Sequence, residues 1–144
     1  MESVKKFLSL AVMAILGAMV VNAPARADSS DHVVVNVPFD FVVGNSTMKA
    51  GDYKIKKLDS GVLELMSSDG QQDHFALVTE GAASANHKGN PYLLFTRYGS
   101  QAFLSKVALS VDDSYDLLRS NEEKKLINSL PAGESGALVT QPVR

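Results

Sequence analysis

The strongest constraint on the fold is an alternation of apolar and polar residues that begins near His32 and recurs in short runs. In one run, for example, Tyr53 and Ile55 alternate with lysines. A period of two places one set of side chains on the core face of a β-strand and the other set toward solvent. Turn residues recur about every ten residues, which favours an antiparallel sheet over alternating strands and helices. We therefore predict an all-β domain, either a small antiparallel sandwich or a partly closed barrel of seven to eight strands.

The predicted strands are joined by recognisable turns. Asp69-Gly70 is the strongest hairpin pattern, because both central residues of a type I′ turn need a positive φ, which Asp tolerates and Gly prefers. The strand that follows it has Phe75 and Leu77 on one face. A second hairpin turn is predicted at 99–100. Of the seven to eight strands predicted, seven are placed at 33–37, 39–43, 53–58, 62–66, 74–79, 92–98 and 102–109.

One helix is predicted near the C-terminus. Ser120 and Glu123 have the spacing of a capping box, and Pro131 ends the helical pattern. The apolar face of this helix is formed by Leu126, Ile127 and Leu130. Residues 131–144 contain Gly, Ser and Pro but few large apolar residues, so we predict a flexible tail there.

The first 27 residues have the pattern of a signal peptide. A basic n-region, an apolar h-region and a small-residue cleavage site follow one another at Lys5-Lys6, 7–21 and Ala25-Arg26-Ala27. We therefore predict export through a cleaved signal peptide, to the periplasm or the extracellular space. The exported β-domain with its terminal helix is then expected at 28–130, followed by the tail.

The predicted exported chain is acidic and has no cysteine. The whole sequence has 14 Lys and Arg against 16 Asp and Glu, and loss of residues 1–27 changes the net charge from −2 to −4. This balance gives no basic surface for nucleic acid. The absence of cysteine excludes disulfides, thiolate metal sites and cysteine nucleophiles, so the fold must depend on packing.

The sequence predicts no catalytic, cofactor-binding or metal site. The histidines do not have the local spacing of metal ligands, since they stand at His32, His74 and His87. The acidic run at 112–116 lacks the spacing and the glycine of a calcium loop, and we interpret it as a solvated turn. No G-x-S-x-G nucleophile elbow is present. We therefore predict that the protein is not an enzyme.

Three segments carry a resemblance to a known group of proteins. They read VNVPFDFVVGNSTMKAGDYKI (35–55), LLFTRYGSQAFLSKV (93–107) and RSNEEKKL (119–126). Together they resemble a family of small exported bacterial β-proteins of unknown function, which has a V-P-F-x-F … A-G-x-Y … R-Y-G pattern. The resemblance implies that these motifs mark the fold, with Pro38 and Gly51 setting the backbone. It implies no functional residue.

An aromatic strand is the predicted interaction surface. Between 92 and 98 both faces of the strand are substantially apolar, so the strand is either central or has one side turned to a partner. Tyrosine and arginine are also frequent at recognition surfaces. The adjoining segment 80–91 is either a ligand-contacting flap or a mobile connection. The candidate interaction residues are Tyr92, Arg97, Tyr98 and His87.

These observations leave three functional hypotheses. The first is an exported non-enzymatic module that binds a partner or interacts with the cell envelope. The second is a lipocalin-like carrier of a small apolar ligand, which requires a cavity of roughly 300 Å³ or more. The third is a small hydrolase, which would have to place His74 or His87 beside a serine and a carboxylate. The envelope or extracellular partner is not specified by the sequence, and no transmembrane span is expected after cleavage.

Overall fold

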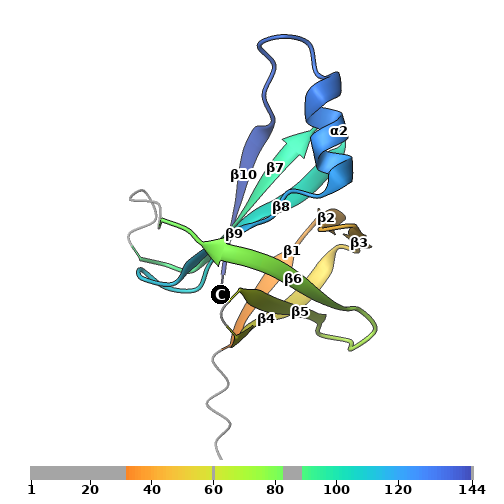
Figure 1. Ribbon diagram of the computed structural model, residues 1–144. Helices are drawn as coiled ribbons and strands as arrows, with labels where there is room; N and C mark the ends of the chain where they lie inside the picture. The colour runs from red at the N-terminus through yellow and green to blue at the C-terminus, as the bar shows by residue number, and fades with distance from the viewer. Residues whose placement is uncertain (1–31, 60, 83–88, 144) are drawn as a thin grey trace, which may run out of the picture.

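A computed structural model describes residues 32–59, 61–82 and 89–143, so the predicted signal peptide lies outside the described residues. The described part of the chain contains ten β-strands and one α-helix (Figure 1). The strands are β1 (His32–Val37), β2 (Phe41–Val43), β3 (Ser46–Met48), β4 (Gly51–Asp59), β5 (Val62–Ser67), β6 (Asp73–Glu80), β7 (Tyr92–Tyr98), β8 (Gln101–Ala108), β9 (Ser114–Leu117) and β10 (Ala137–Pro142). The helix, α2, spans Asn121–Ser129.

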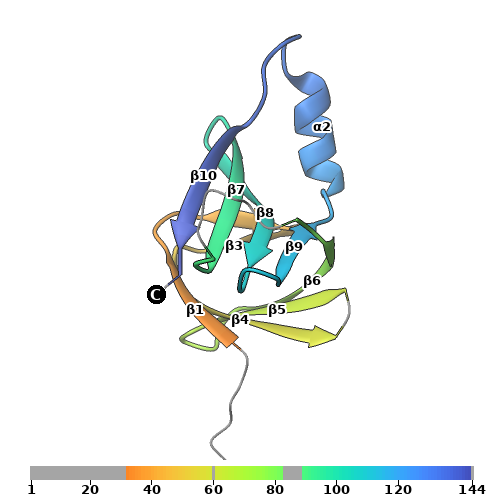
Figure 2. The same ribbon diagram turned by 90° about the vertical axis from the view of Figure 1, so that its left-hand side faces the viewer.

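The strands form one bent, mixed sheet in the order β1-β4-β5-β6-β9-β8-β2-β3, with β7 beside β8 and β10 beside β7. All pairings are antiparallel except that of β2 with β8. β6 connects the two halves of the sheet, because its first part pairs with β5 and its last three residues pair with β9. The two halves fold over each other, and β10 comes close to β1 without a hydrogen-bonded ladder in the described residues (Figure 2). The predicted all-β architecture is confirmed, and the sheet is not closed into a barrel.

The space between the two halves of the sheet is filled by side chains. Phe41 lies at its centre and makes edge-to-face contacts with Tyr53 and Phe95, at centroid distances of 5.2 and 5.3 Å. Such ring pairs stabilise a core beyond the burial of their area. The largest fully buried side chains are Tyr53, Phe41, Phe95, Ile55, Leu63, Leu65, Leu93, Val35, Val37, Val43 and Val107. This packing stabilises a chain that has no disulfide.

Helix α2 covers the outer face of β7 and β8. Its N-cap is Ser120, whose Oγ accepts a hydrogen bond from the Glu123 N–H at 3.1 Å, as the capping-box pattern predicts. The apolar residues of the helix pack against a second small cluster formed by Val42, Tyr98 and Phe103. No helix in the described ranges is long and apolar enough to cross a membrane.

The C-terminal segment differs from the prediction of a flexible tail. Residues 137–142 form β10, which pairs with β7 from Ala137↔Arg97 to Pro142↔Tyr92. Because this pairing is made by backbone groups, it needs few large apolar residues, and only Val139 and Val143 of the segment pack against the core. The sequence predicted seven to eight strands, whereas the described residues form ten, and the three strands that it did not place are β3, β9 and β10.

Candidate functional site

The two tyrosines of the predicted interaction surface are buried in the structure. Tyr92 and Tyr98 are only 3% and 9% exposed, since β10 lies beside β7 and helix α2 covers the ring of Tyr98. Arg97 is half-buried, with its guanidinium 5.2 Å from the ring centroid of Phe39. His87 lies outside the described residues. The aromatic strand is therefore a central strand, and the structure places its tyrosines in the packing of the fold.

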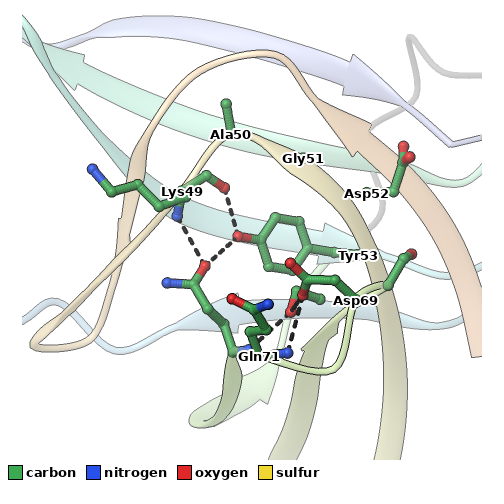
Figure 3. Close-up of a pocket in the computed structure, with 10 residues that line it drawn as sticks. Lys49, Ala50, Gly51, Asp52, Tyr53, Asp69 and Gln71 are labelled. Carbon is green, nitrogen blue, oxygen red and sulfur yellow. Dashed lines mark hydrogen bonds between the residues drawn. The ribbon is translucent and has the colours of Figure 1, made fainter.

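Two hollows open on the surface of the described residues. The first, which we call the polar hollow, has a volume of about 450 Å³ (Figure 3). It lies between the start of β4 and the turn that joins β5 to β6. Its lining residues are Lys49, Ala50, Gly51, Asp52, Tyr53, Ser67, Ser68, Asp69, Gln71 and Gln72.

A hydrogen-bond network crosses the polar hollow. The Tyr53 hydroxyl lies 2.5 Å from the Lys49 carbonyl and 2.9 Å from Gln72 Oε1, so its single proton is shared between two acceptors. Gln72 Oε1 also accepts from the Lys49 N–H at 3.1 Å. These contacts, which Figure 3 shows as dashed lines, tie the segment before β4 to the β5–β6 turn. Burial is the main cause that raises the pKa of the Tyr53 hydroxyl, which therefore stays protonated and remains a donor.

The carboxylates around the polar hollow are also engaged. The Asp69 pKa is lowered by the hydrogen bonds it accepts from the Ser67 hydroxyl and the Gln71 N–H, at 2.5 and 3.0 Å. At the rim, the Asp40 pKa is lowered by the Ala50 N–H and by the Lys49 ammonium group. Since these groups bind one another, the polar hollow is explained as a structural junction of two turns.

The second hollow, which we call the β6 groove, has a volume of about 340 Å³ and a different chemistry. It runs along one edge of β6, between the β2–β3 turn and the connection from β9 to α2. Its lining residues are Gly44, Asn45, His74, Phe75, Ala76, Leu77, Leu117, Leu118, Arg119, Ser120 and Asn121. This set contains Arg119 and His74 but no carboxylate.

Large apolar side chains are exposed at the β6 groove. Phe75, Leu77 and Leu118 are 56%, 65% and 55% exposed. The sequence placed Phe75 and Leu77 on one face of a strand, and the structure shows that this face is turned to solvent, whereas Ala76 and Val78 face the core. Adjacent apolar side chains with this degree of exposure are typical of sites that contact a partner.

The backbone of β6 is also open at the β6 groove. The Val78 N–H donates to the Gly61 carbonyl on the β5 side at 2.9 Å. Because successive residues of a strand direct their N–H and C=O groups to opposite edges, Leu77 and Phe75 direct theirs to the other side. There the Leu77 carbonyl accepts from the Leu118 N–H at 3.4 Å. β9 itself pairs with β6 only from Val78 to Glu80, and within the described ranges no strand pairs with this edge at Asp73–Leu77.

Among the residues that the structure describes, which do not include His87, neither hollow combines a histidine, a serine and a carboxylate as the hydrolase hypothesis requires. His74 shares the β6 groove with Ser120, and no Asp or Glu lines it. Its imidazole instead lies beside the β2–β3 turn, where a Cβ added to Gly44 would be 3.5 Å from Nε2. Within the described ranges, no group of three His, Cys, Asp or Glu side chains is placed to hold a metal ion.

Comparison of the chain with protein-family models, with curated proteins and with solved structures found no match. The candidate site is therefore defined by its own geometry. The sequence did not indicate the β6 groove, because Phe75, Ala76, Leu77 and Val78 are all apolar and the pattern does not say which face of the strand is buried. The one sequence feature that could have drawn attention to this groove is the apolar pair Leu117 and Leu118 next to Arg119.

Proposed function

We propose that the protein is an exported, non-enzymatic binding module of the periplasm or the extracellular space, and that the β6 groove is where it binds its partner. The observation that carries this proposal is that Phe75, Leu77 and Leu118 are each more than half exposed, beside a stretch of β6 with which no described strand pairs. Covering about 100 Å² of apolar surface contributes about 2.5 kcal/mol. A partner that covers these three side chains would therefore gain binding free energy from their burial.

The interior of the domain favours a binding module over a carrier. The side chains between the two halves of the sheet are fully buried and in mutual contact, from Val35 on β1 to Leu93 and Phe95 on β7. Both hollows described above open to solvent at the surface. A carrier of an apolar ligand needs an enclosed apolar cavity, whereas a binding module needs an exposed apolar site.

The export part of the proposal rests on the sequence pattern of residues 1–27 and on the resemblance to small exported bacterial β-proteins. N-terminal sequencing of the protein recovered from outside the cytoplasm is expected to begin at Asp28. A chain that retains Met1 and stays in the cytoplasmic fraction would contradict export.

The binding site is tested by photocrosslinking in the producing cell. A photoreactive phenylalanine analogue is placed at Phe75 in one variant and at Leu138, which is 68% exposed on β10, in the control variant. We expect a discrete crosslinked adduct from position 75 and not from position 138. Equal crosslinking at both positions, or none at position 75, would show that the β6 groove is not the binding site.

A further inference from the structure

We infer that the partner of the β6 groove is an extended polypeptide segment, which pairs with residues 73–77 of β6 as an added strand. This inference rests on the proposed function, because it names the class of partner for the same groove. An added strand binds mainly through its backbone, and its side chains provide the specificity.

The backbone of β6 presents the hydrogen-bonding groups that an added strand needs. The N–H and C=O groups of Phe75 are directed to the β6 groove, since those of Leu77 are directed there and alternate residues share an edge. A strand on this edge would take the position that β9 takes farther along, where Val78 pairs with Leu117. The chain leaves this position itself, because it turns at Ser120 to begin helix α2. An added strand would therefore extend the sheet along the same edge of β6 that pairs with β9.

The side chains around this edge indicate the composition of the segment. On the solvent face, Phe75 and Leu77 would lie beside every second residue of an added strand, which favours apolar residues at those positions. Arg119 is exposed and stands at the same groove, and its closest ion-pair contact, with Glu123, is long at 3.9 Å. Because Arg119 stands at one end of the edge and Asp73 at the other, we expect the segment to carry Asp or Glu at its end near Arg119.

The probe for this inference is a set of random linear peptides displayed on phage and selected against the exported chain, residues 28–144. Selected peptides are expected to alternate apolar residues and to include Asp or Glu. A synthetic copy of one selected peptide is then measured by calorimetry, and hydrogen exchange is followed at the amide of Phe75. We expect that amide to become protected when the peptide binds.

Two matched pairs separate strand addition from simple apolar contact. Phe75→Pro and Phe75→Ala both lose the ring, but only proline removes the edge N–H, so we expect the proline variant to bind at least about tenfold more weakly than the alanine variant. In the second pair, the peptide is N-methylated on one set of alternate residues or on the other. Methylation of the set whose N–H groups face β6 should abolish binding, and methylation of the other set should leave binding nearly unchanged. This second pair tests strand addition even if the proline variant does not fold.

The outcomes distinguish the inference from the proposed function. Equal affinity of both N-methylated peptides, with loss of binding in Phe75→Ala, would overturn strand addition and keep the β6 groove as a binding site. Failure to select any peptide whose binding depends on Phe75 would also overturn strand addition. In that case crosslinking at position 75 decides the proposed function independently.

Discussion

Replacing Tyr53 by phenylalanine tests whether the polar hollow is a structural junction. The ring of Tyr53 is 1% exposed and packs against Phe41, and Tyr53→Phe keeps that contact. The substitution removes only the hydroxyl, which lies 2.5 Å from the Lys49 carbonyl and 2.9 Å from Gln72 Oε1. A hydrogen bond contributes about 1 kcal/mol net, and here the Lys49 carbonyl and Gln72 Oε1 both lose the Tyr53 hydroxyl as a donor. Lys49 is exposed, so water can replace part of the loss. We expect the free energy of unfolding to fall by about 1 to 2 kcal/mol.

The assay is equilibrium unfolding in urea, with Tyr115→Phe as the control. Tyr115 is also buried, at 3% exposure, but its hydroxyl donates to Asp113, two residues away, and its other polar neighbour is the half-buried Lys57 of β4, whose ammonium group lies 4.8 Å from the centroid of the ring. We expect this variant to lose less than about 1 kcal/mol. An unfolding free energy unchanged by Tyr53→Phe, or a larger loss in Tyr115→Phe, would refute the structural interpretation of the polar hollow.

The same substitution predicts a change in the alkaline limb of stability. The Tyr53 pKa is raised above its usual value of 10.0 in the folded protein, first by burial and then by the charge of Asp69. A phenol with a raised pKa is held protonated by the fold, so its contribution is complete below pH 10 and is lost as the pH rises through the folded pKa. Tyr53→Phe should therefore lose stability less steeply above pH 10 than the parent protein.

Two further predictions concern the C-terminal elements. The Glu123 pKa is raised by burial, so the folded protein favours the protonated carboxyl group. The stability that Glu123 contributes is therefore lost as the pH rises from 4.5, the usual pKa of this group, through its raised pKa in the folded protein. Glu123→Gln lacks this dependence, and its unfolding free energy in urea should rise relative to the parent protein across that interval and then stay level. An unaltered pH profile would contradict the burial of the charge. Deleting residues 137–144 removes β10 and the packing of Val139, which should lower the unfolding free energy by about 2 kcal/mol and, through the uncovered edge of β7, cause concentration-dependent association in size-exclusion chromatography. A truncated chain that stays monomeric with unchanged stability would contradict the role of β10.

Local patterns in the sequence predicted the local structure well. The hairpin at Asp69-Gly70 is present, with Gly70 at a φ of +71°. Its turn is longer than the two-residue type I′ loop, since the Ser67 N–H reaches the Gln72 carbonyl at 2.7 Å. The capping box at Ser120 and Glu123 likewise marks the start of α2. In each case the residues that determine the element lie within a few positions of one another.

The candidate site depends on contacts between segments distant in the sequence, and for that reason it was not predicted. Tyr98 and Glu123 are 25 residues apart, and only the packing of α2 on β7 shows that Tyr98 is covered and that its hydroxyl lies 3.3 Å from Glu123 Oε1. The β6 groove similarly combines the β2–β3 turn, β6 and the segment before α2. Periodicity identifies the two faces of β6 but cannot tell which one another layer covers.

An unpaired strand edge such as that of β6 can in principle be covered by another copy of the chain as well as by a peptide. Unpaired strand edges tend to pair with other chains, and proteins limit this with short edges and charged residues. Here the open part of β6 covers only residues 73–77, with Asp73 at one end and Arg119 beside the other. A second copy of β6 would bring Phe75, Leu77 and Asp73 to this edge, which is the apolar alternation with an acidic residue expected of an added strand, but its folded domain would meet the wall formed by Leu118 and Arg119. A single extended segment has no folded domain attached and does not meet this obstacle. The short length of the open edge and the residues beside it therefore favour a short peptide strand as its partner.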